Sequence, residues 1–210
     1  YYGITVSVLG TLNVLEAARL LGVGRIIYAG SIAEYVQSIF NSPGVDVPRF
    51  NISGSNLVDE YTPIFDPTSG PSVYNCTKIV PGIIGMTYHS HLGVDWVHIR
   101  ICGIYGFGQK PEVAKTTEMI VENAVDGVPT KLPSRGDGMK DMTYIKDEVS
   151  AILLALDAKE EKLKHRVFQV SGQEMVNDLQ AYKIVREFIP DAVCEFGQKE
   201  EQSRRPFNPS

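Results

Sequence analysis

Residues 25–31, RIIYAGS, contain a short continuous apolar run that ends in Gly-Ser. Runs of this kind are typical of strands that are buried on both faces of a parallel sheet. A helix is predicted before this strand, because apolar residues recur at helical spacing from Val8 to Leu21 and Gly22 follows as a stop signal. The order of helix and then strand is the first indication of an α/β fold.

The rest of the chain repeats this alternation. Further helices are predicted at 72–91, 113–125, 147–156 and 177–188, and further strands at 94–101, 167–170 and 193–196. We interpret 131–140 as a loop, 142–145 as a short extended piece and 36–71 as a long irregular connection. Pro81 must kink the helix predicted at 72–91 or remove one of its hydrogen bonds. The alternation predicts an α/β fold with a largely parallel sheet.

The composition is that of one globular domain, or of two lobes that share a core. The chain has 210 residues, of which 43% are hydrophobic, and a formal net charge of −5. This charge gives no electrostatic footprint for nucleic acid, and no continuous apolar run approaches the roughly 20 residues that cross a bilayer. We therefore expect neither nucleic acid nor a membrane as a partner. The three separated cysteines and four histidines show no metal-ligand spacing, so no metal is expected and a cytoplasmic location is predicted.

Tyr74 and Lys78 lie four residues apart in SVYNCTK (72–78), which places them on one face of the predicted helix. They could form a solvated polar stripe, or the lysine could make the tyrosine proton easier to remove. Ser31 and the segment 101–103 end the strands on either side of this helix in the sequence, and ligands bind at the carboxyl ends of parallel strands. This convergence on one edge of the sheet favours the functional interpretation.

Four segments resemble successive blocks of a known family. They are GTLNVLEAARLLGVGRIIYAGS (10–31), YNCTK (74–78), RICGIYGFG (100–108) and DMTYIKDEVSAILLAL (141–156). In this order and spacing they resemble the extended short-chain dehydrogenase/reductase family, the NAD-dependent epimerases and dehydratases. The resemblance implies a Rossmann-type parallel sheet that is incomplete at its amino-terminal half, with a smaller carboxyl-terminal substrate-binding lobe. The family's Gly-x-x-Gly-x-x-Gly phosphate-binding turn does not occur in this sequence and is expected upstream of it.

The resemblance also implies roles for individual residues. Tyr74 is similar to the family's acid/base tyrosine, and Ser31 is similar to the hydroxyl that hydrogen-bonds the reacting substrate oxygen. Lys78 is similar to the lysine that favours loss of the tyrosine proton and holds the nicotinamide ribose. The implied cofactor is NAD or NADP. Its contacts are expected from Ala29, Gly30, Tyr74, Lys78, Ile101 and Cys102, and substrate contacts are expected from Ser31, Gly103, Lys140 and Arg205.

The resemblance assigns 1–103 to the carboxyl-terminal portion of the dinucleotide-binding domain. It assigns 104–210 mainly to the substrate-binding lobe, with 142–157 and 167–170 as candidates to pack back on the Rossmann sheet. The chain departs from the family's usual residues at Ser7, Gly30, Val36, Gly82, Ile83, Gly103 and Lys140. These departures weaken assignment as a nucleotide-sugar epimerase without touching the Ser–Tyr–Lys core. Extra residues around 40–57 are interpreted either as a lid over the substrate or as a surface elaboration.

The expected activity is NAD(P)-dependent oxidation of a secondary alcohol on a sugar, sugar acid or nucleotide sugar, as a dehydrogenase, epimerase or dehydratase. The expected partner is a small sugar-like molecule, and a homodimer is considered as well. The alternative is a non-catalytic relative that binds a dinucleotide for a regulatory or structural role. The intact Ser31, Tyr74 and Lys78 favour the enzyme, whereas Ser7 and Gly103 keep the alternative open.

Overall fold

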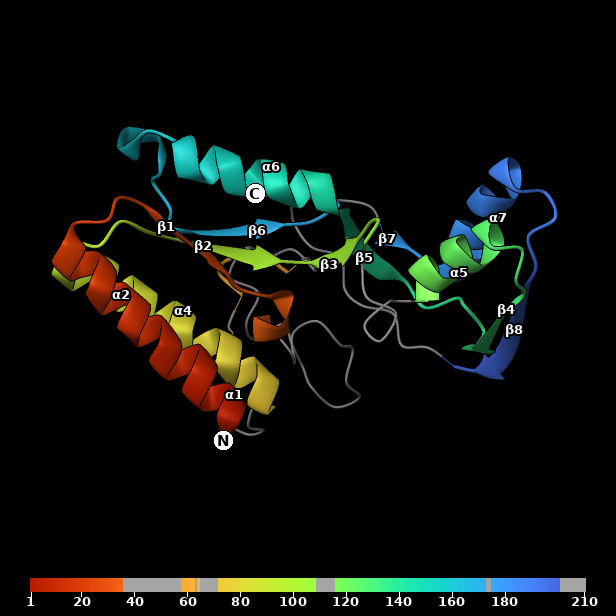
Figure 1. The fold of residues 1–210 in the computed structure, drawn as a ribbon, viewed down its shortest axis with the longest axis horizontal. Helices are drawn as coiled ribbons and strands as arrows, with labels where there is room; N and C mark the ends of the chain where they lie inside the picture. The colour runs from red at the N-terminus through yellow and green to blue at the C-terminus, as the bar shows by residue number, and fades with distance from the viewer. Residues whose placement is uncertain (36–57, 63, 65–71, 109–115, 173–174, 201–210) are drawn as a thin grey trace.

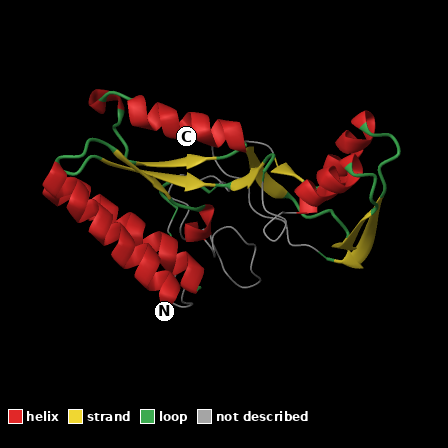
Figure 2. Ribbon diagram, viewed as in Figure 1, coloured by secondary structure: helices red, strands yellow, loops and turns green. Residues whose placement is uncertain are grey.

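The computed structural model describes residues 1–35, 58–62, 64, 72–108, 116–172 and 175–200. A larger lobe has a sheet between two layers of helices, and a smaller lobe of helices and short strands lies at the other end of the long axis (Figures 1 and 2). Strands and helices alternate along the chain. The predicted α/β fold class is confirmed.

The central sheet has three parallel strands in the order β1-β2-β6, namely β1 (Ile26–Ala29), β2 (Trp96–Ile101) and β6 (Val167–Val170). In the register of these strands, His98 of β2 pairs with Tyr28 on one side and with Val167 on the other. Because all three strands are parallel, their carboxyl ends meet at one edge of the sheet. The last residues of the three strands at this edge are Ala29, Ile101 and Val170.

Helices cover both faces of this sheet. On one face lie α2 (Gly10–Leu21) and α4 (Val73–Leu92), and on the other lies α6 (Ile145–Asp157) (Figure 1). The core is accordingly split, because Leu15 packs with Val94 and Trp96 on one side while Val97 and Ile99 pack toward α6. The helix α4 continues through Pro81, which lacks the amide for one backbone hydrogen bond.

The first helix is longer than the sequence suggested. A short α1 (Tyr2–Ile4), a π-helical turn η1 (Thr5–Leu9) and α2 follow one another without a break. With 20 residues and a mean hydropathy of 1.4, Tyr2–Leu21 could cross a membrane by length and composition alone. No continuous apolar run reaches this length, as predicted, because Glu16 and Arg19 interrupt it, but the helix continues through both residues. The expectation that a membrane is not a partner stays a prediction. In the structure this helix packs against α4.

The smaller lobe contains two further sheets and two helices. Its elements are β3 (Gly103–Tyr105), α5 (Thr116–Val125), β4 (Thr130–Ser134), β5 (Lys140–Tyr144), β7 (Met175–Val176), α7 (Asp178–Phe188) and β8 (Cys194–Lys199). One sheet has the order β3-β5-β7 and the other pairs β4 with β8 in parallel. Asn177 caps α7 in a capping box with Gln180, as the sequence predicted for either Asn177 or Asp178.

The prediction of a loop over 131–140 is wrong at its start. Residues Thr130–Ser134 form β4, with side chains that are alternately buried and exposed. The partner strand β8 lies about 60 residues further along the chain, so local sequence gives little sign of the pairing. Pro133 and the exposed Lys131 also obscure the strand pattern, although a proline is tolerated in a strand at a sheet edge.

Candidate active site

The segment after β1 places Ser31 at the carboxyl edge of the central sheet. The Gly30 amide donates to the Ile99 carbonyl at 2.8 Å, which fixes the end of β1 against β2. The chain then enters the 3₁₀ turn η2 (Ile32–Tyr35). The Ser31 Oγ accepts a hydrogen bond from the Ala33 amide at 3.1 Å. The hydroxyl proton has no acceptor among the residues that the structure describes, so it is available to a ligand.

The start of α4 brings Lys78 to the same edge. The Lys78 Nζ donates to the Ala29 carbonyl at 3.2 Å, and the Tyr28 hydroxyl donates to the Lys78 carbonyl at 3.1 Å. Two hydrogen bonds therefore join α4 to the end of β1, and η2 packs against α4 as well. Tyr74 lies one turn before Lys78 and is 55% exposed. The predicted Ser31, Tyr74 and Lys78 thus come from two neighbouring segments at one edge of the sheet.

The other predicted residues are distributed over this edge and the smaller lobe. Ile101 ends β2, and the buried Cys102 packs with Ile32 and Tyr35 of η2. Gly103 begins β3. Lys140 begins β5, where its Nζ lies 2.6 Å from the Oδ2 of the fully buried Asp178 and 2.8 Å from the Thr116 Oγ1. Arg205 and the segment 40–57 lie outside the described residues.

A buried charged cluster lies directly behind Ser31, and the sequence analysis missed it. It consists of Glu34, His98 and Arg100, whose exposed fractions are 1%, 2% and 6%. Glu34 Oε1 accepts from the Ser31 amide at 3.0 Å and lies 2.9 Å from His98 Nε2, and Glu34 Oε2 accepts from Arg100 Nε at 2.9 Å. The spacing S-x-x-E from residue 31 to residue 34 is a capping-box signal that could have identified Glu34.

The cluster keeps Glu34 ionised. Burial alone would raise the pKa of this carboxyl. The hydrogen bond from His98 and the charges of His98 and Arg100 outweigh burial, and the Ser31 amide adds to their effect, so the pKa lies below its usual value of 4.5. A charged acceptor therefore faces the Ser31 amide, which makes that hydrogen bond stronger than one between neutral groups.

Glu148, in the first turn of α6, is a second buried carboxyl that the sequence analysis missed. It is 1% exposed, and burial raises its pKa to about 7. The approaching Cys102 amide offsets part of this effect, whereas the charges of Asp141 and Asp147 add to it. Among the described residues, neither carboxyl oxygen of Glu148 has a hydrogen bond of ordinary geometry. A group that titrates near neutrality therefore lies beside the predicted cofactor residue Cys102.

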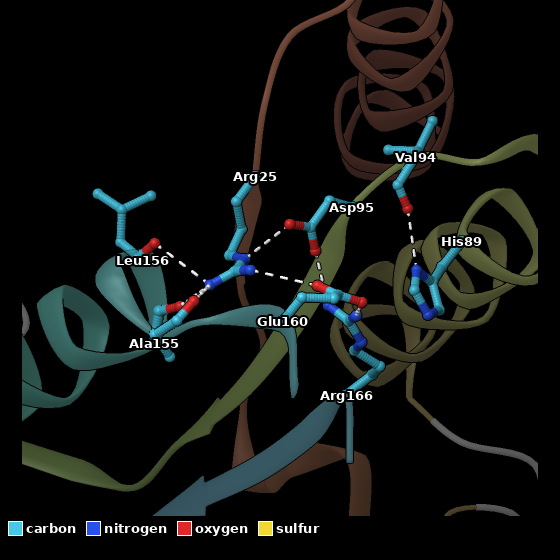
Figure 3. Close-up of polar contacts among 9 residues, drawn as sticks. Arg25, His89, Val94, Asp95, Ala155, Leu156, Glu160 and Arg166 are labelled. Atoms are coloured by element: carbon cyan, nitrogen blue, oxygen red, sulfur yellow. Dashed lines mark hydrogen bonds and ion pairs between the residues drawn. The ribbon is translucent and has the colours of Figure 1, made fainter. Parts of the chain in front are cut away.

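A different charged cluster joins the amino ends of the same strands (Figure 3). Asp95 accepts from Arg25 Nε at 2.8 Å and from Arg166 Nη1 at 2.6 Å, and Arg166 also pairs with Glu160. Arg25 Nη1 donates to the Ala155 carbonyl at 2.9 Å in the last turn of α6. This cluster ties β1, β2 and β6 to α6 at the edge opposite Ser31.

The residues at the carboxyl edge fit the nicotinamide-ribose end of the dinucleotide that the resemblance implies. Lys78 presents an ammonium at the end of β1, and the exposed Tyr74 presents a hydroxyl. Ribose hydroxyls can be bound by such donors. Gly106 and Gly108 have positive φ angles of 148° and 96° and follow β3, but the printed sequence has no Gly-x-x-Gly-x-x-Gly turn. The fit is therefore to one end of the cofactor.

Comparison with known proteins agrees with the resemblance found in the sequence. A model of the NAD dependent epimerase/dehydratase family matches residues 2–171. The chain is 26% identical over 152 residues to the UDP-glucose 4-epimerase of Mycolicibacterium smegmatis, covering 72% of this chain and 43% of that protein. The chain spans about half the length of the curated relatives it matches.

Two solved structures share the fold. The GalE-like L-threonine dehydrogenase from Cupriavidus necator superposes with a TM-score of 0.72 at 24% identity, covering 92% of this chain and 57% of that one. The UDP-glucose 4-epimerase of Thermus thermophilus, solved in complex with NAD, gives a TM-score of 0.72 at 22% identity, covering 98% of this chain and 62% of that one.

Proposed function

Because the chain belongs to the NAD dependent epimerase/dehydratase family, we propose that the protein containing it is an oxidoreductase or isomerase that oxidises a secondary alcohol. The substrate class is a sugar, a sugar acid or a nucleotide sugar, which the name of the UDP-glucose 4-epimerase relative supports. The observation that carries this proposal is the hydrogen bond from Lys78 to the end of β1. This bond places the first turns of α4, with the exposed Tyr74 one turn before Lys78, beside the segment that holds Ser31.

The three side chains have complementary roles in this proposal. Tyr74 accepts the proton of the substrate hydroxyl as a general base. The resemblance assigns Lys78, one helical turn further along the same helix, to assist this proton transfer. Ser31 donates its unengaged proton to the substrate oxygen as charge develops there. Lys78 also binds the ribose hydroxyls of the cofactor, and NAD, which the family's description names, supplies the hydride acceptor when bound.

We also propose which lobe binds the cofactor and which binds the substrate. Residues 1–103 form the carboxyl-terminal portion of a dinucleotide-binding domain, and 104–210 form mainly a substrate-binding lobe. Residues 142–157 and 167–170 return to the dinucleotide-binding sheet in this assignment. The pairing of β6 with β2 and the packing of α6 on β1 and β2 support it.

The test is cofactor turnover by the full-length protein that contains residues 1–210. It is incubated with NAD or NADP and a panel of sugars, sugar acids and nucleotide sugars, and both reduced cofactor and carbohydrate products are followed. A dehydrogenase forms reduced cofactor in step with product, whereas an epimerase or dehydratase forms product without net reduction. Binding of NAD without turnover on any substrate of the panel would instead support the non-catalytic alternative.

A further inference from the structure

We propose that Glu34 is a positioning residue, which holds the backbone of Ser31 so that the serine hydroxyl stays directed at the reacting substrate oxygen. The catalytic part of this inference rests on the proposed function. The mechanical part, that Glu34 fixes the Ser31 turn, stands on the described contacts alone. Glu34 touches neither substrate nor cofactor in this account and acts through Ser31.

Two hydrogen bonds hold the turn that carries Ser31. The Ser31 amide donates to Glu34 Oε1 at 3.0 Å, and the Ala33 amide donates to the Ser31 Oγ at 3.1 Å. The first bond fixes the backbone of the serine, and the second fixes the direction of its hydroxyl oxygen. With that oxygen occupied as an acceptor of the Ala33 amide, the hydroxyl proton remains for an oxygen outside the turn.

Glu34 can fix Ser31 because Glu34 is itself held from the neighbouring strand. His98 and Arg100, both on β2, contact its two carboxyl oxygens. Arg100 in turn donates to the Tyr35 hydroxyl and to the Glu60 carbonyl, and its guanidinium lies 4.6 Å from the centre of the Tyr35 ring. The carboxylate is therefore anchored to the central sheet rather than to the turn that it holds.

Two glycines make room for this cluster. A Cβ atom at Gly30 would overlap the His98 imidazole and would lie 2.6 Å from Glu34 Oε1. A Cβ atom at Gly82 would lie 2.6 Å from His98 Cε1. Both positions are among those where the chain departs from the family's usual residues. The buried cluster gives these departures a common physical reason, since larger residues there would displace His98.

A purely stabilising role and a positioning role make different demands on residue 34. Pairing with Arg100 needs the negative charge, whereas holding Ser31 needs only an acceptor oxygen at the Oε1 position. Glu34→Gln removes the charge and keeps an acceptor. Its amide oxygen should occupy the Oε1 position, because two donors, the Ser31 amide and His98 Nε2, face that position. Glu34→Ala removes both the charge and the acceptor.

The experiment compares these two variants in the full-length protein, with Asp95→Asn from the opposite cluster as a matched control. For each protein we would measure kcat, substrate KM, cofactor affinity, melting temperature and hydrogen–deuterium exchange of the peptide spanning residues 30–35. We expect Glu34→Ala to lower kcat about 30-fold with a substrate KM within a few-fold of wild type. This loss is smaller than the roughly 100- to 1,000-fold that follows removal of an oxyanion-stabilising donor, because the variant keeps the Ser31 hydroxyl. Exchange of the Ser31 amide should accelerate about tenfold, as expected when a hydrogen bond to a charged group is lost.

Glu34→Gln should lose melting temperature, since Arg100 and His98 lose their counter-charge, yet it should recover kcat to within about fivefold of wild type and keep slow Ser31 exchange. Asp95→Asn should lose melting temperature without any change in kcat or in exchange at residues 30–35. If Glu34→Gln and Glu34→Ala reduce kcat equally, or if Glu34→Ala has wild-type kcat, the positioning role is overturned. A wild-type protein without turnover would refute the proposed function, and the exchange data would still decide whether Glu34 fixes Ser31.

Discussion

The two charged clusters at opposite edges of the central sheet are both built from carboxylates and cationic side chains, but they hold different parts of the molecule. At the amino end, Asp95 bridges two arginines, and one of them also donates to a carbonyl in the last turn of α6. At the carboxyl end, Glu34 bridges Arg100 and His98 but also accepts the backbone amide of Ser31. That one additional hydrogen bond joins a structural ion pair to a residue of the candidate site.

The difference follows from strand direction. In a parallel sheet the segments that leave the carboxyl ends meet ligands, whereas those at the amino ends only connect elements. A charge at the amino end should therefore affect stability alone, and a charge at the carboxyl end should affect both stability and rate. The following variants test this separation, beginning with the largest expected effect.

Lys78→Met should lower kcat/KM about 100-fold in the full-length protein, because the lysine is proposed to act on both the ribose and the tyrosine. Cofactor affinity should fall as well, since the ammonium that is proposed to bind the ribose hydroxyls is lost. The control is Lys131→Met, which removes an exposed ammonium paired with Glu195 in the smaller lobe. A fall in cofactor affinity without any fall in kcat would restrict Lys78 to ribose binding.

Asp95→Asn should reduce the free energy of unfolding by about 2 kcal/mol, because it removes one of the two carboxylates, Asp95 and Glu160, that the mostly buried Arg25 and Arg166 share. The kcat should stay within about twofold of wild type, since the amino end makes no contact with the candidate site among the described residues. Urea unfolding and steady-state kinetics measure the two quantities. A clear fall in kcat beside the fall in the free energy of unfolding would contradict the distinction between the two ends of the sheet.

Glu148→Gln should change how stability depends on pH. The pKa of Glu148 rises on folding from its usual 4.5 to about 7, so its contribution to stability is fully present below pH 4.5 and is lost as the pH rises through 7. Between about pH 5 and pH 8 the wild type should lose roughly 2 kcal/mol from this group, a loss that the glutamine variant avoids. Thermal unfolding of both proteins across this range measures the difference. Parallel curves for the two proteins would contradict the assignment.

Glu34 should behave in the opposite way to Glu148. Its pKa is lowered on folding, so its contribution to stability is present above the unfolded value of 4.5 and is lost as the pH falls through its lower folded value. The carboxyl-end cluster is therefore expected to weaken only in acid, while the group beside Cys102 is expected to weaken the fold toward neutral and alkaline pH. Burial is common to both carboxyls, and the charged partners decide the direction.

Local pattern was enough to predict the parts of the fold that local physics determines. The strand at Val167–Val170 was predicted as observed, and the observed cap Asn177 is one of the two residues, Asn177 or Asp178, predicted for that position. A short apolar run and a capping side chain are both recognised from neighbouring residues. The strand Thr130–Ser134 was missed, because its pairing with β8 is non-local.

The candidate site shows the same division. Tyr74 and Lys78 were identified because four residues make one helical turn, and Ser31 because it ends a strand. His98 and Arg100 alternate along β2 with apolar residues, and nothing near them in the sequence points to Glu34. Only the parallel pairing of β1 with β2 and the turn after β1 bring the three together. The cluster is therefore a product of tertiary structure, although the S-x-x-E spacing marked one of its members.

The rate at which reduced cofactor first forms on the full-length protein tests directly whether this edge of the sheet, with Tyr74, carries the chemistry. Stopped-flow fluorescence of the NAD-loaded protein mixed with a substrate from the panel detects it for a dehydrogenase and for an epimerase alike. Tyr74→Phe is compared with Tyr88→Phe. Tyr88 lies near the other end of α4, and its hydroxyl donates to Glu16 of α2. We predict that Tyr74→Phe slows reduction by about 100-fold or more and that Tyr88→Phe leaves it unchanged. Equal rates for Tyr74→Phe and wild type would contradict the claim that this edge of the sheet carries the chemistry.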